Sequence, residues 1–281
     1  MSEFNSKKVF ISGGSSGIGK GLALAFAEAG ASVFVSARGK DALERTVNEL
    51  REVGTSNARF DFGVADVSDS NRVNDVSQKA LDILGGLDIL ICNSGYAKTG
   101  TVIETEESDF RSLMDVNFFG HVNVVKAFQE HFVSQRRGEI VLLSSMLATF
   151  SIYGYGAYAA SKFAITGFAQ SLRQEMMTYN VRVKLFLPPT TDTPGLEKEN
   201  FDKPALSKEV EMGSLLNATH SVDSVVQAFL EWFPKRKFVG YASWDSWLQY
   251  FVIRHFPELA LTIADGELRS AQKRLDKKSK L

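Results

Sequence analysis

The sequence has almost no cysteine, no excess of one charge and no apolar run at its N-terminus. Its single cysteine, Cys92, cannot form an intrachain disulfide, which excludes a disulfide-stapled domain. The 32 Lys and Arg residues nearly cancel the 33 Asp and Glu residues, so the formal net charge of -1 excludes the basic surface typical of nucleic-acid-binding proteins. Residues 1–8 are polar where a signal peptide requires an apolar segment. We therefore expect an unprocessed cytoplasmic protein with no nucleic-acid partner.

The composition is that of an ordinary globular protein. Hydrophobic residues make up 44% and charged residues 23% of the chain, which excludes a disordered or collagen-like protein. No repeat or low-complexity tract divides the sequence, so we predict one domain over residues 1–281. Up to about residue 187, short apolar runs alternate with helical stretches, which is typical of an α/β fold with a buried parallel sheet. The expected strands are residues 9–12, 32–36, 58–64, 87–92, 139–144 and 182–187.

A glycine-rich turn follows the first expected strand. The run Gly13-Gly14-Ser15-Ser16-Gly17-Ile18-Gly19-Lys20 leads into an alanine-rich amphipathic helix. Glycines in such a turn let the backbone approach a pyrophosphate, whose charge the N-terminus of the helix stabilises. The alternative is a tight turn without a ligand, but the continuing βαβ pattern favours a dinucleotide site in a Rossmann-type, doubly wound sheet with helices on both faces. The candidate cofactor contacts in this turn are Gly13, Ser15, Ser16, Gly17, Ile18 and Gly19.

The end of the second expected strand distinguishes NAD from NADP. A carboxylate at this position binds the 2′-hydroxyl of the NAD ribose, whereas a basic residue binds the 2′-phosphate of NADP. This sequence has Arg38 and Lys40 there, and no carboxylate before Asp41. With Ser15 as a further donor, these residues predict NADPH or NADP⁺ as the cofactor. The alternative is an exposed arginine at the end of a strand.

A tyrosine and a lysine four residues apart form the next candidate site. Tyr158 and Lys162 fall on one face of a helix expected over residues 156–177. This spacing arises by chance in many chains, so on its own it is more often structural. Two further polar residues accompany the pair: Ser145 follows the fifth expected strand, and Asn117 lies in the helical stretch before that strand.

Together these residues resemble the pattern of the short-chain dehydrogenase/reductase family. After the glycine-rich turn come Asp66-Val67, Asn93-Ser94-Gly95, Asn117, Ser144-Ser145, Tyr158 with Lys162, and Pro188-Pro189, in the order usual for the family. The resemblance covers residues 7–195 and implies a dinucleotide-binding and catalytic core over that range. It adds Asp66, Val67, Asn93, Gly95, Tyr158, Lys162, Pro188 and Thr193 to the expected cofactor contacts. Two positions depart from the family pattern, since Ser12 replaces a threonine and Pro189 replaces a glycine.

The resemblance implies a catalytic role for four residues. Reduction of a ketone needs a hydride at carbon and a proton at oxygen, and free tyrosine is a poor acid or base at neutral pH. We expect Tyr158 to donate the proton and Lys162 to lower the pKa of Tyr158, because a nearby cation favours the phenolate. The resemblance further implies that Lys162 binds the nicotinamide ribose, that Ser145 orients the carbonyl, and that Asn117 holds a water for the proton relay.

Several segments, most of them after the sixth expected strand, are similar to those of the 3-ketodihydrosphingosine reductases. This subfamily reduces the keto group of a long-chain sphingoid base. The similarity rests on residues 13–19, 188–195, 197–200 and 203–204. It implies a long-chain keto lipid as substrate. The polar stretch 190–217 is expected to form a substrate-side loop or short mobile helices. Tyr153 and Tyr155 lack a lysine four residues later and are expected to form part of the pocket wall.

Residues 238–281 are expected to form a C-terminal helical extension with a basic tail. Residues 238–253 carry one formal charge, Asp245, and one expected helical face presents Trp244, Trp247, Leu248, Phe251 and Val252. The run is shorter than the roughly 20 apolar residues that a transmembrane helix needs, so we do not expect it to span a membrane. Two interpretations stay open. The extension contacts a membrane surface peripherally, or it packs on the core or on another subunit.

Three functions are compatible with these residues. The leading hypothesis is NADPH-dependent reduction of 3-ketodihydrosphingosine, or a close long-chain keto lipid, in sphingolipid synthesis. A generic carbonyl or 3-oxoacyl reductase would use the same residues with a different pocket. A non-catalytic cofactor-sensing interaction protein would share the fold, but the intact set of Asn117, Ser145, Tyr158 and Lys162 argues against it. The family resemblance also implies a homo-oligomer. The four histidines have no spacing suited to metal ligation, so no metal is expected.

Overall fold

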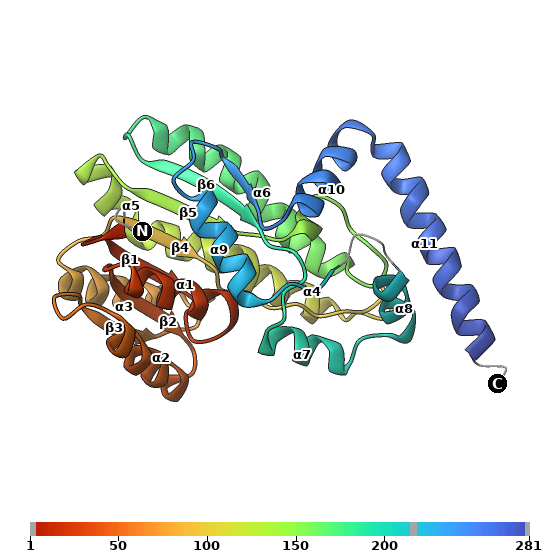
Figure 1. Cartoon of the computed structure of the whole chain (residues 1–281), viewed down its shortest axis with the longest axis horizontal. Coiled ribbons are helices and arrows are strands. Elements are labelled where there is room, and N and C mark those ends of the chain that lie inside the picture. Colours follow the sequence, from red (N-terminus) through yellow and green to blue (C-terminus); the bar gives the residue numbers. More distant parts are fainter. Residues whose placement is uncertain (1–3, 214–217, 279–281) are drawn as a thin grey trace.

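A seven-stranded parallel sheet forms the centre of the computed structural model, which describes residues 4–213 and 218–278 (Figure 1). Its strands are β1 (Lys8–Ser12), β2 (Ser32–Ala37), β3 (Phe60–Val64), β4 (Ile89–Cys92), β5 (Glu139–Leu143), β6 (Arg182–Leu187) and β7 (Val239–Tyr241). They are ordered β3-β2-β1-β4-β5-β6-β7, and every neighbouring pair is parallel. The direction of winding reverses between β1 and β4, and a reversal of this kind leaves a crevice at the carboxyl ends of the strands. The predicted doubly wound α/β fold is confirmed.

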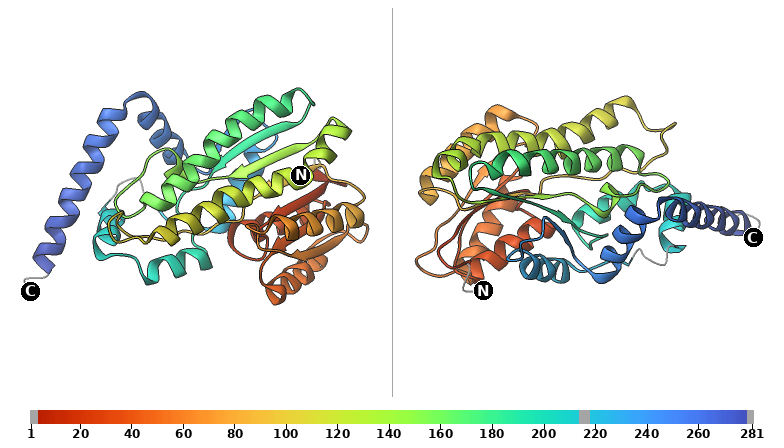
Figure 2. Two further views of the ribbon diagram at one scale, coloured as in Figure 1. Left: turned by 180° about the vertical axis from the view of Figure 1, so that it is seen from behind. Right: turned by 90° about the horizontal axis from the view of Figure 1, so that it is seen from above.

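Helices cover both faces of the sheet (Figure 2). On one face lie α1 (Gly17–Glu28), α2 (Lys40–Val53) and α9 (Val222–Trp232), and on the other lie α3 (Ser70–Leu84), α5 (Gly120–Gln135) and α6 (Gly156–Met177). Side chains of β1 alternate between the two cores: Val9 and Ile11 pack under α1, whereas Phe10 packs on Phe34 and Phe128 with ring centroids 5.7 and 4.7 Å apart. Because both faces are covered, most strands are apolar along most of their length, whereas the edge strand β3 is only partly buried.

The helical stretch before β5 contains an irregular turn. It consists of α4 (Glu107–Leu113), the π-helical segment η2 (Met114–Phe119) and α5. Within η2 the amide of Gly120 donates to the carbonyl of Asp115, five residues earlier. Widened turns of this type occur frequently at functional sites, and this one contains Asn117.

The strand β7 was not predicted. Its residues were expected to belong to one helical stretch beginning at Phe238, but Val239–Tyr241 instead pair in parallel with the end of β6. Helix α10 (Trp244–His255) begins only after Ser243, whose side chain accepts a hydrogen bond from the amide of Ser246. Three residues are too few to show strand periodicity, so pairing with β6 decides their conformation.

The segment expected as a loop or short helices at 190–217 is helical over most of its described part. It forms α7 (Pro194–Phe201) and α8 (Ala205–Gly213), while residues 214–217 lie outside the described residues. The expected basic tail is also helical, as part of α11 (Pro257–Lys278), which packs on α8 and α10. Within residues 4–213 and 218–278, no helix combines the length and apolarity needed to cross a membrane.

Candidate active site

The glycine-rich turn between β1 and α1 is held closed by side chains from β1 and from the residues after β4. The Ser12 hydroxyl accepts hydrogen bonds from the amides of Asn93 (3.0 Å) and Ser94 (3.2 Å), which ties the end of β1 to the residues after β4. The Asn93 amide group donates to the carbonyls of Ser12 and Gly13, both at 3.1 Å. Gly13 has a φ of +70°, and a Cβ at Gly19 would lie 2.3 Å from the Gly13 carbonyl oxygen. Only glycine fits these two positions.

This turn has the form required for a dinucleotide pyrophosphate. Ser15, Ser16, Gly17 and Ile18 line a cleft at the N-terminus of α1. Among the described residues, Ser16 caps α1 without a side-chain hydrogen bond to the helix, so the first amides of α1 are available to an anion. Gly19 is not among the described lining residues of the cleft; it packs against the Gly13 carbonyl inside the turn.

Arg38 and Asp66 lie close to each other at one end of the cleft. An Arg38 guanidinium nitrogen is 3.8 Å from a carboxylate oxygen of Asp66, and both residues line the cleft. Burial acts to raise the pKa of Asp66, but hydrogen bonds from Ser68 and the charge of Arg38 outweigh it, and the pKa falls below its usual value. Lys40, the other basic candidate, begins α2 and lies 3.5 Å from Glu44, outside the described cleft lining.

One continuous cleft joins this end to the proposed catalytic residues. It has a volume of about 970 Å³ and runs along the carboxyl ends of the strands. The predicted site residues that line it are Gly13, Ser15, Ser16, Gly17, Ile18, Arg38, Asp66, Val67, Asn93, Gly95, Ser145, Tyr158, Lys162, Pro188 and Thr193. Gly19, Lys40 and Asn117 are not among the described lining residues.

Ser145, Tyr158 and Lys162 meet in the middle of the cleft. Ser145 follows β5, and its side chain forms a hydrogen bond with Tyr158 while accepting another from the amide of Leu147 at 3.1 Å. Tyr158 and Lys162 lie one turn apart on α6, with the Lys162 ammonium 5.7 Å from the centre of the Tyr158 ring. The Ser144 hydroxyl donates to the Lys162 carbonyl at 2.9 Å, which ties α6 to the end of β5.

Burial is the main influence on the pKa values of Tyr158 and Lys162. The pKa of Tyr158 is raised to about 12, mainly by burial. The hydrogen bond with Ser145 acts to lower this pKa, and the charge of Glu199 acts to raise it. Lys162 is not among the groups that shift this pKa, so its expected lowering effect on Tyr158 stays a prediction. Burial also lowers the pKa of Lys162 to about 8, which leaves the ammonium mostly charged at neutral pH. A protonated phenol is the form that a proton donor requires.

Asn117 is completely buried behind the cleft wall. Its side-chain oxygen accepts from the amide of Tyr96 at 2.9 Å, and its nitrogen donates to the Tyr96 carbonyl at 3.0 Å and to the Ser161 hydroxyl at 2.9 Å. These three bonds use both amide protons, so the side chain is committed to joining the chain after β4 to α6. A water of the expected proton relay would therefore have to bind a group other than the Asn117 side-chain nitrogen.

Comparison with known proteins agrees with this geometry. The sequence pattern of the short chain dehydrogenase family matches residues 7–204. The chain belongs to this family. It is 37% identical over 198 residues to mouse 3-ketodihydrosphingosine reductase, covering 70% of this chain and 60% of that protein. It is 33% identical over 226 residues to zebrafish (Danio rerio) 3-dehydrosphinganine reductase, covering 80% of this chain and 68% of that protein. The matched region thus spans about 60% of the mouse relative's length.

Solved structures of other short-chain dehydrogenases share the fold. A short chain dehydrogenase/reductase from Burkholderia phymatum in complex with NAD superposes with a TM-score of 0.80 at 23% identity, covering 92% of this chain and 96% of that chain. A short chain dehydrogenase from Mycobacterium paratuberculosis bound to NAD superposes with a TM-score of 0.72 at 26% identity, covering 83% and 92%.

The far end of this dehydrogenase's cleft contains residues that the sequence did not single out. Its walls come from the residues after β5 and from α7, α8, α10 and α11, and include Met146, Leu147, Phe150, Ile152, Leu196, Glu199, Val210, Glu211, Val252, Ile253, Ala260, Ile263 and Ala264. Tyr155 lines the cleft as expected, whereas Tyr153 is not among its described lining residues. The available signal was the apolar spacing of Ala260, Ile263 and Ala264, which suits one face of a helix.

Proposed function

We propose that this dehydrogenase reduces the 3-keto group of a long-chain sphingoid base with NADPH. The observation that carries the proposal is the meeting of Ser145, Tyr158 and Lys162 in a cleft that extends from the glycine-rich turn to a largely apolar far end. The mouse and zebrafish relatives support the sphingoid substrate by their names. A 3-oxoacyl-[acyl-carrier protein] reductase from Brucella melitensis has a TM-score of 0.71 but only 27% identity, so the generic 3-oxoacyl reductase is the weaker alternative.

The residues divide the reaction between them. When bound, NADPH supplies the hydride that the carbonyl carbon receives. The protonated Tyr158 phenol donates its proton to the carbonyl oxygen, and the Ser145 hydroxyl, bonded to the same phenol, orients that oxygen. The Lys162 ammonium then stabilises the phenolate that remains. Consumption of NADPH with 3-ketodihydrosphingosine, together with detection of dihydrosphingosine, tests the proposal, and no turnover of this ketone would contradict it.

Replacing Arg38 with alanine is expected to weaken NADPH far more than NADH. A charge-assisted contact of guanidinium with phosphate contributes about 1.5 to 3 kcal/mol, so KM for NADPH should rise by roughly 10-fold to 150-fold. Arg45→Ala is the matched control, because it removes an exposed arginine of α2 outside the described cleft lining. Steady-state kinetics with both cofactors measure the effect. Equal kcat/KM for NADPH and NADH in the native protein would refute the role of Arg38.

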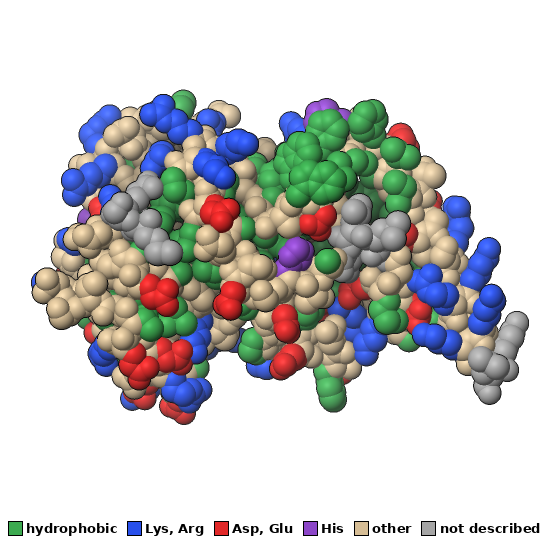
Figure 3. Space-filling view, in the orientation of Figure 1, with side chains coloured by type: hydrophobic (Ala, Val, Ile, Leu, Met, Phe, Trp, Pro, Cys, Tyr) green, Lys and Arg blue, Asp and Glu red, His purple; other side chains and the backbone are tan. Residues whose placement is uncertain are grey.

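We further propose that α10 and the start of α11 contact a membrane surface. Figure 3 shows hydrophobic side chains gathered over α10 and the start of α11, with Lys and Arg side chains further along α11. Trp244 is 70% exposed, and Trp247, Phe251 and Phe256 are exposed beside it. Aromatic side chains suit the headgroup boundary, and the basic residues suit anionic lipid.

The double substitution Trp244→Ser with Trp247→Ser is expected to reduce binding to anionic liposomes by at least about tenfold, because each large apolar side chain contributes roughly 1.5 to 3 kcal/mol when buried. Reduction of a short soluble ketone should change little. Met177→Ser is the control, since Met177 is exposed at the end of α6, away from this surface. Liposome co-sedimentation measures the effect, and unchanged binding would show that these tryptophans do not face lipid.

We also propose a homo-oligomer that pairs through α5 and α6. Phe119 and Phe163 are exposed beside these helices, and Gly167 has open space around its Cα on α6. A small residue allows close approach of a second copy, and exposed aromatic rings offer apolar surface for it to cover. Analytical ultracentrifugation should detect a dimer or larger assembly at micromolar concentration, and a monomer would overturn the proposal.

A further inference from the structure

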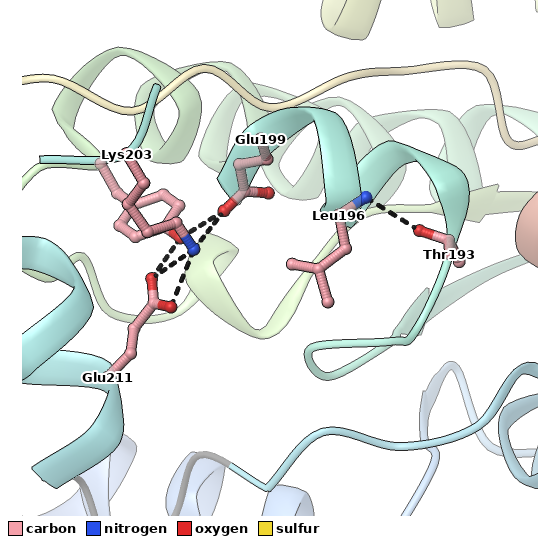
Figure 4. Close-up of polar contacts among 6 residues, drawn as sticks. Thr193, Leu196, Glu199, Lys203 and Glu211 are labelled. Carbon is pink, nitrogen blue, oxygen red and sulfur yellow. Dashed lines mark hydrogen bonds and ion pairs between the residues drawn. The ribbon is translucent and has the colours of Figure 1, made fainter. Parts of the chain in front are cut away.

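Four polar side chains form a compact cluster beside the part of the cleft that α7 and α8 line. Figure 4 shows Lys203 between the carboxylates of Glu199 and Glu211, which come from α7 and α8. The Lys203 ammonium is 2.9 Å from Glu199 and 2.8 Å from Glu211. Tyr155 directly precedes α6, and its hydroxyl donates to both carboxylates. We call these four residues the Glu199–Glu211 cluster.

This cluster carries a net negative charge in nearly buried surroundings. The side chain of Lys203 is 1% exposed, and those of Glu199 and Glu211 are 11% and 17% exposed. Two carboxylates surround one ammonium, so one negative charge is left without a counter-charge inside the cluster. Tyr155 has a single proton and can donate it to only one of the two carboxylates at a time. The uncompensated negative charge and the free acceptor capacity of the two carboxylates would therefore both be satisfied by one more cationic hydrogen-bond donor.

The cluster lies close to the proposed catalytic tyrosine. The rings of Tyr155 and Tyr158 are 6.2 Å apart, and Tyr155, Glu199 and Glu211 all line the same cleft as Tyr158. The charge of Glu199 contributes to the raised pKa of Tyr158, so its field reaches the reacting phenol. A cation held by the cluster would thus stand next to a carbonyl held at Tyr158.

Within the described residues, the other cations near the cleft do not occupy this position. Lys98 pairs with Asp109 at 2.6 Å, and Lys162 lies beneath the Tyr158 ring at 5.7 Å. Lys198 borders the cleft from α7, but it is exposed to solvent. The counter-charge of the cluster is therefore best supplied by the substrate itself.

We propose that the Glu199–Glu211 cluster binds an ammonium group adjacent to the reacting carbonyl, so that the enzyme selects α-amino ketones. This inference rests on the proposed function and specifies its substrate class. The role is one of specificity: the cluster positions the ketone by its neighbouring cation, while proton transfer remains with Tyr158. A cluster that served only to join α7 to α8 would affect every ketone alike.

The test compares two long-chain ketones of equal length, one with an ammonium on the carbon next to the carbonyl and one without it. The native enzyme should prefer the amino ketone by at least about tenfold in kcat/KM, because a desolvated charge pair contributes at least about 1.5 kcal/mol. Glu199→Gln and Glu211→Gln should each reduce this preference several-fold. Glu197→Gln removes the same charge from an exposed position on α7 and should keep it.

The ratio between the two ketones separates the possible outcomes. A change in folding, cofactor binding or Tyr158 acidity alters turnover of both ketones and cancels in the ratio. Equal kcat/KM for the two ketones in the native enzyme would overturn the inference and leave long-chain ketone reduction intact. A preference that both glutamine variants retain would also overturn it. If the native enzyme reduces neither ketone, the proposed function itself fails.

Discussion

Tyr158→Phe is expected to lower kcat by two orders of magnitude or more while leaving NADPH binding nearly unchanged. Loss of a positioned acid typically costs 10²-fold to 10⁴-fold in rate. Tyr158 is bonded to Ser145 in the cleft, and its raised pKa keeps the phenol protonated at neutral pH. Removing only the hydroxyl removes the proton and leaves the ring in place. NADPH absorbance measures kcat, and cofactor fluorescence measures binding.

Two further variants make this prediction specific. Tyr153→Phe removes a hydroxyl from the turn before α6, outside the described cleft lining, and should leave kcat within about twofold. Lys162→Ala should impair both turnover and cofactor binding, since the resemblance places this ammonium against the nicotinamide ribose. A Tyr158→Phe enzyme with nearly normal kcat would require another proton donor in the cleft.

The second large effect concerns the length of the substrate. We expect kcat/KM to rise about fourfold for each methylene added to the ketone, because burial of one methylene contributes roughly 0.8 kcal/mol. The apolar far end of the cleft, with Val252 and Ile253 from α10 and Ala260 and Ile263 from α11, provides the surface for that burial. The rise should end when the chain fills the cleft. A homologous series of ketones assayed with NADPH measures this dependence.

The Ile263→Asp variant, assayed with the same series of ketones, tests whether α11 contacts the substrate chain. A carboxylate on the wall should reduce kcat/KM for long ketones and spare short ones, since only a long chain reaches α11. Glu258→Asp, on an exposed position of the same helix, is the control. Equal kcat/KM for short and long ketones in the native enzyme would contradict the sphingoid substrate and favour the generic carbonyl reductase.

Local patterns in the sequence were sufficient to predict most strands of the sheet and to identify the family. Six of the seven strands were predicted from runs of four to seven residues, most of them apolar because they are buried on both faces, whereas the edge strand β3 is only partly buried. The glycine-rich turn was also predictable, since the backbone at Gly13 and the close approach at Gly19 exclude other residues. Helix 156–177 was predicted with its observed bounds, which placed Tyr158 and Lys162 on one face.

Tertiary packing decided the features that no local pattern records. Val239–Tyr241 is a strand because β6 offers an unpaired edge, and the pKa of Tyr158 is raised because burial outweighs the hydrogen bond with Ser145. Asn117 lies behind the cleft because its amide binds Tyr96 and Ser161, which come from other elements.

The far end of the cleft depends on packing in the same way. Tyr155 meets Glu199 and Glu211 across 44 and 56 residues of sequence, and α11 returns to line the cleft that begins at Gly13. The sequence by itself therefore determined the fold and the family, because backbone constraints and apolar periodicity act between neighbours. Only the tertiary structure determined the electrostatics and the walls of the substrate end, because desolvation and charge pairing depend on which distant residues are brought together.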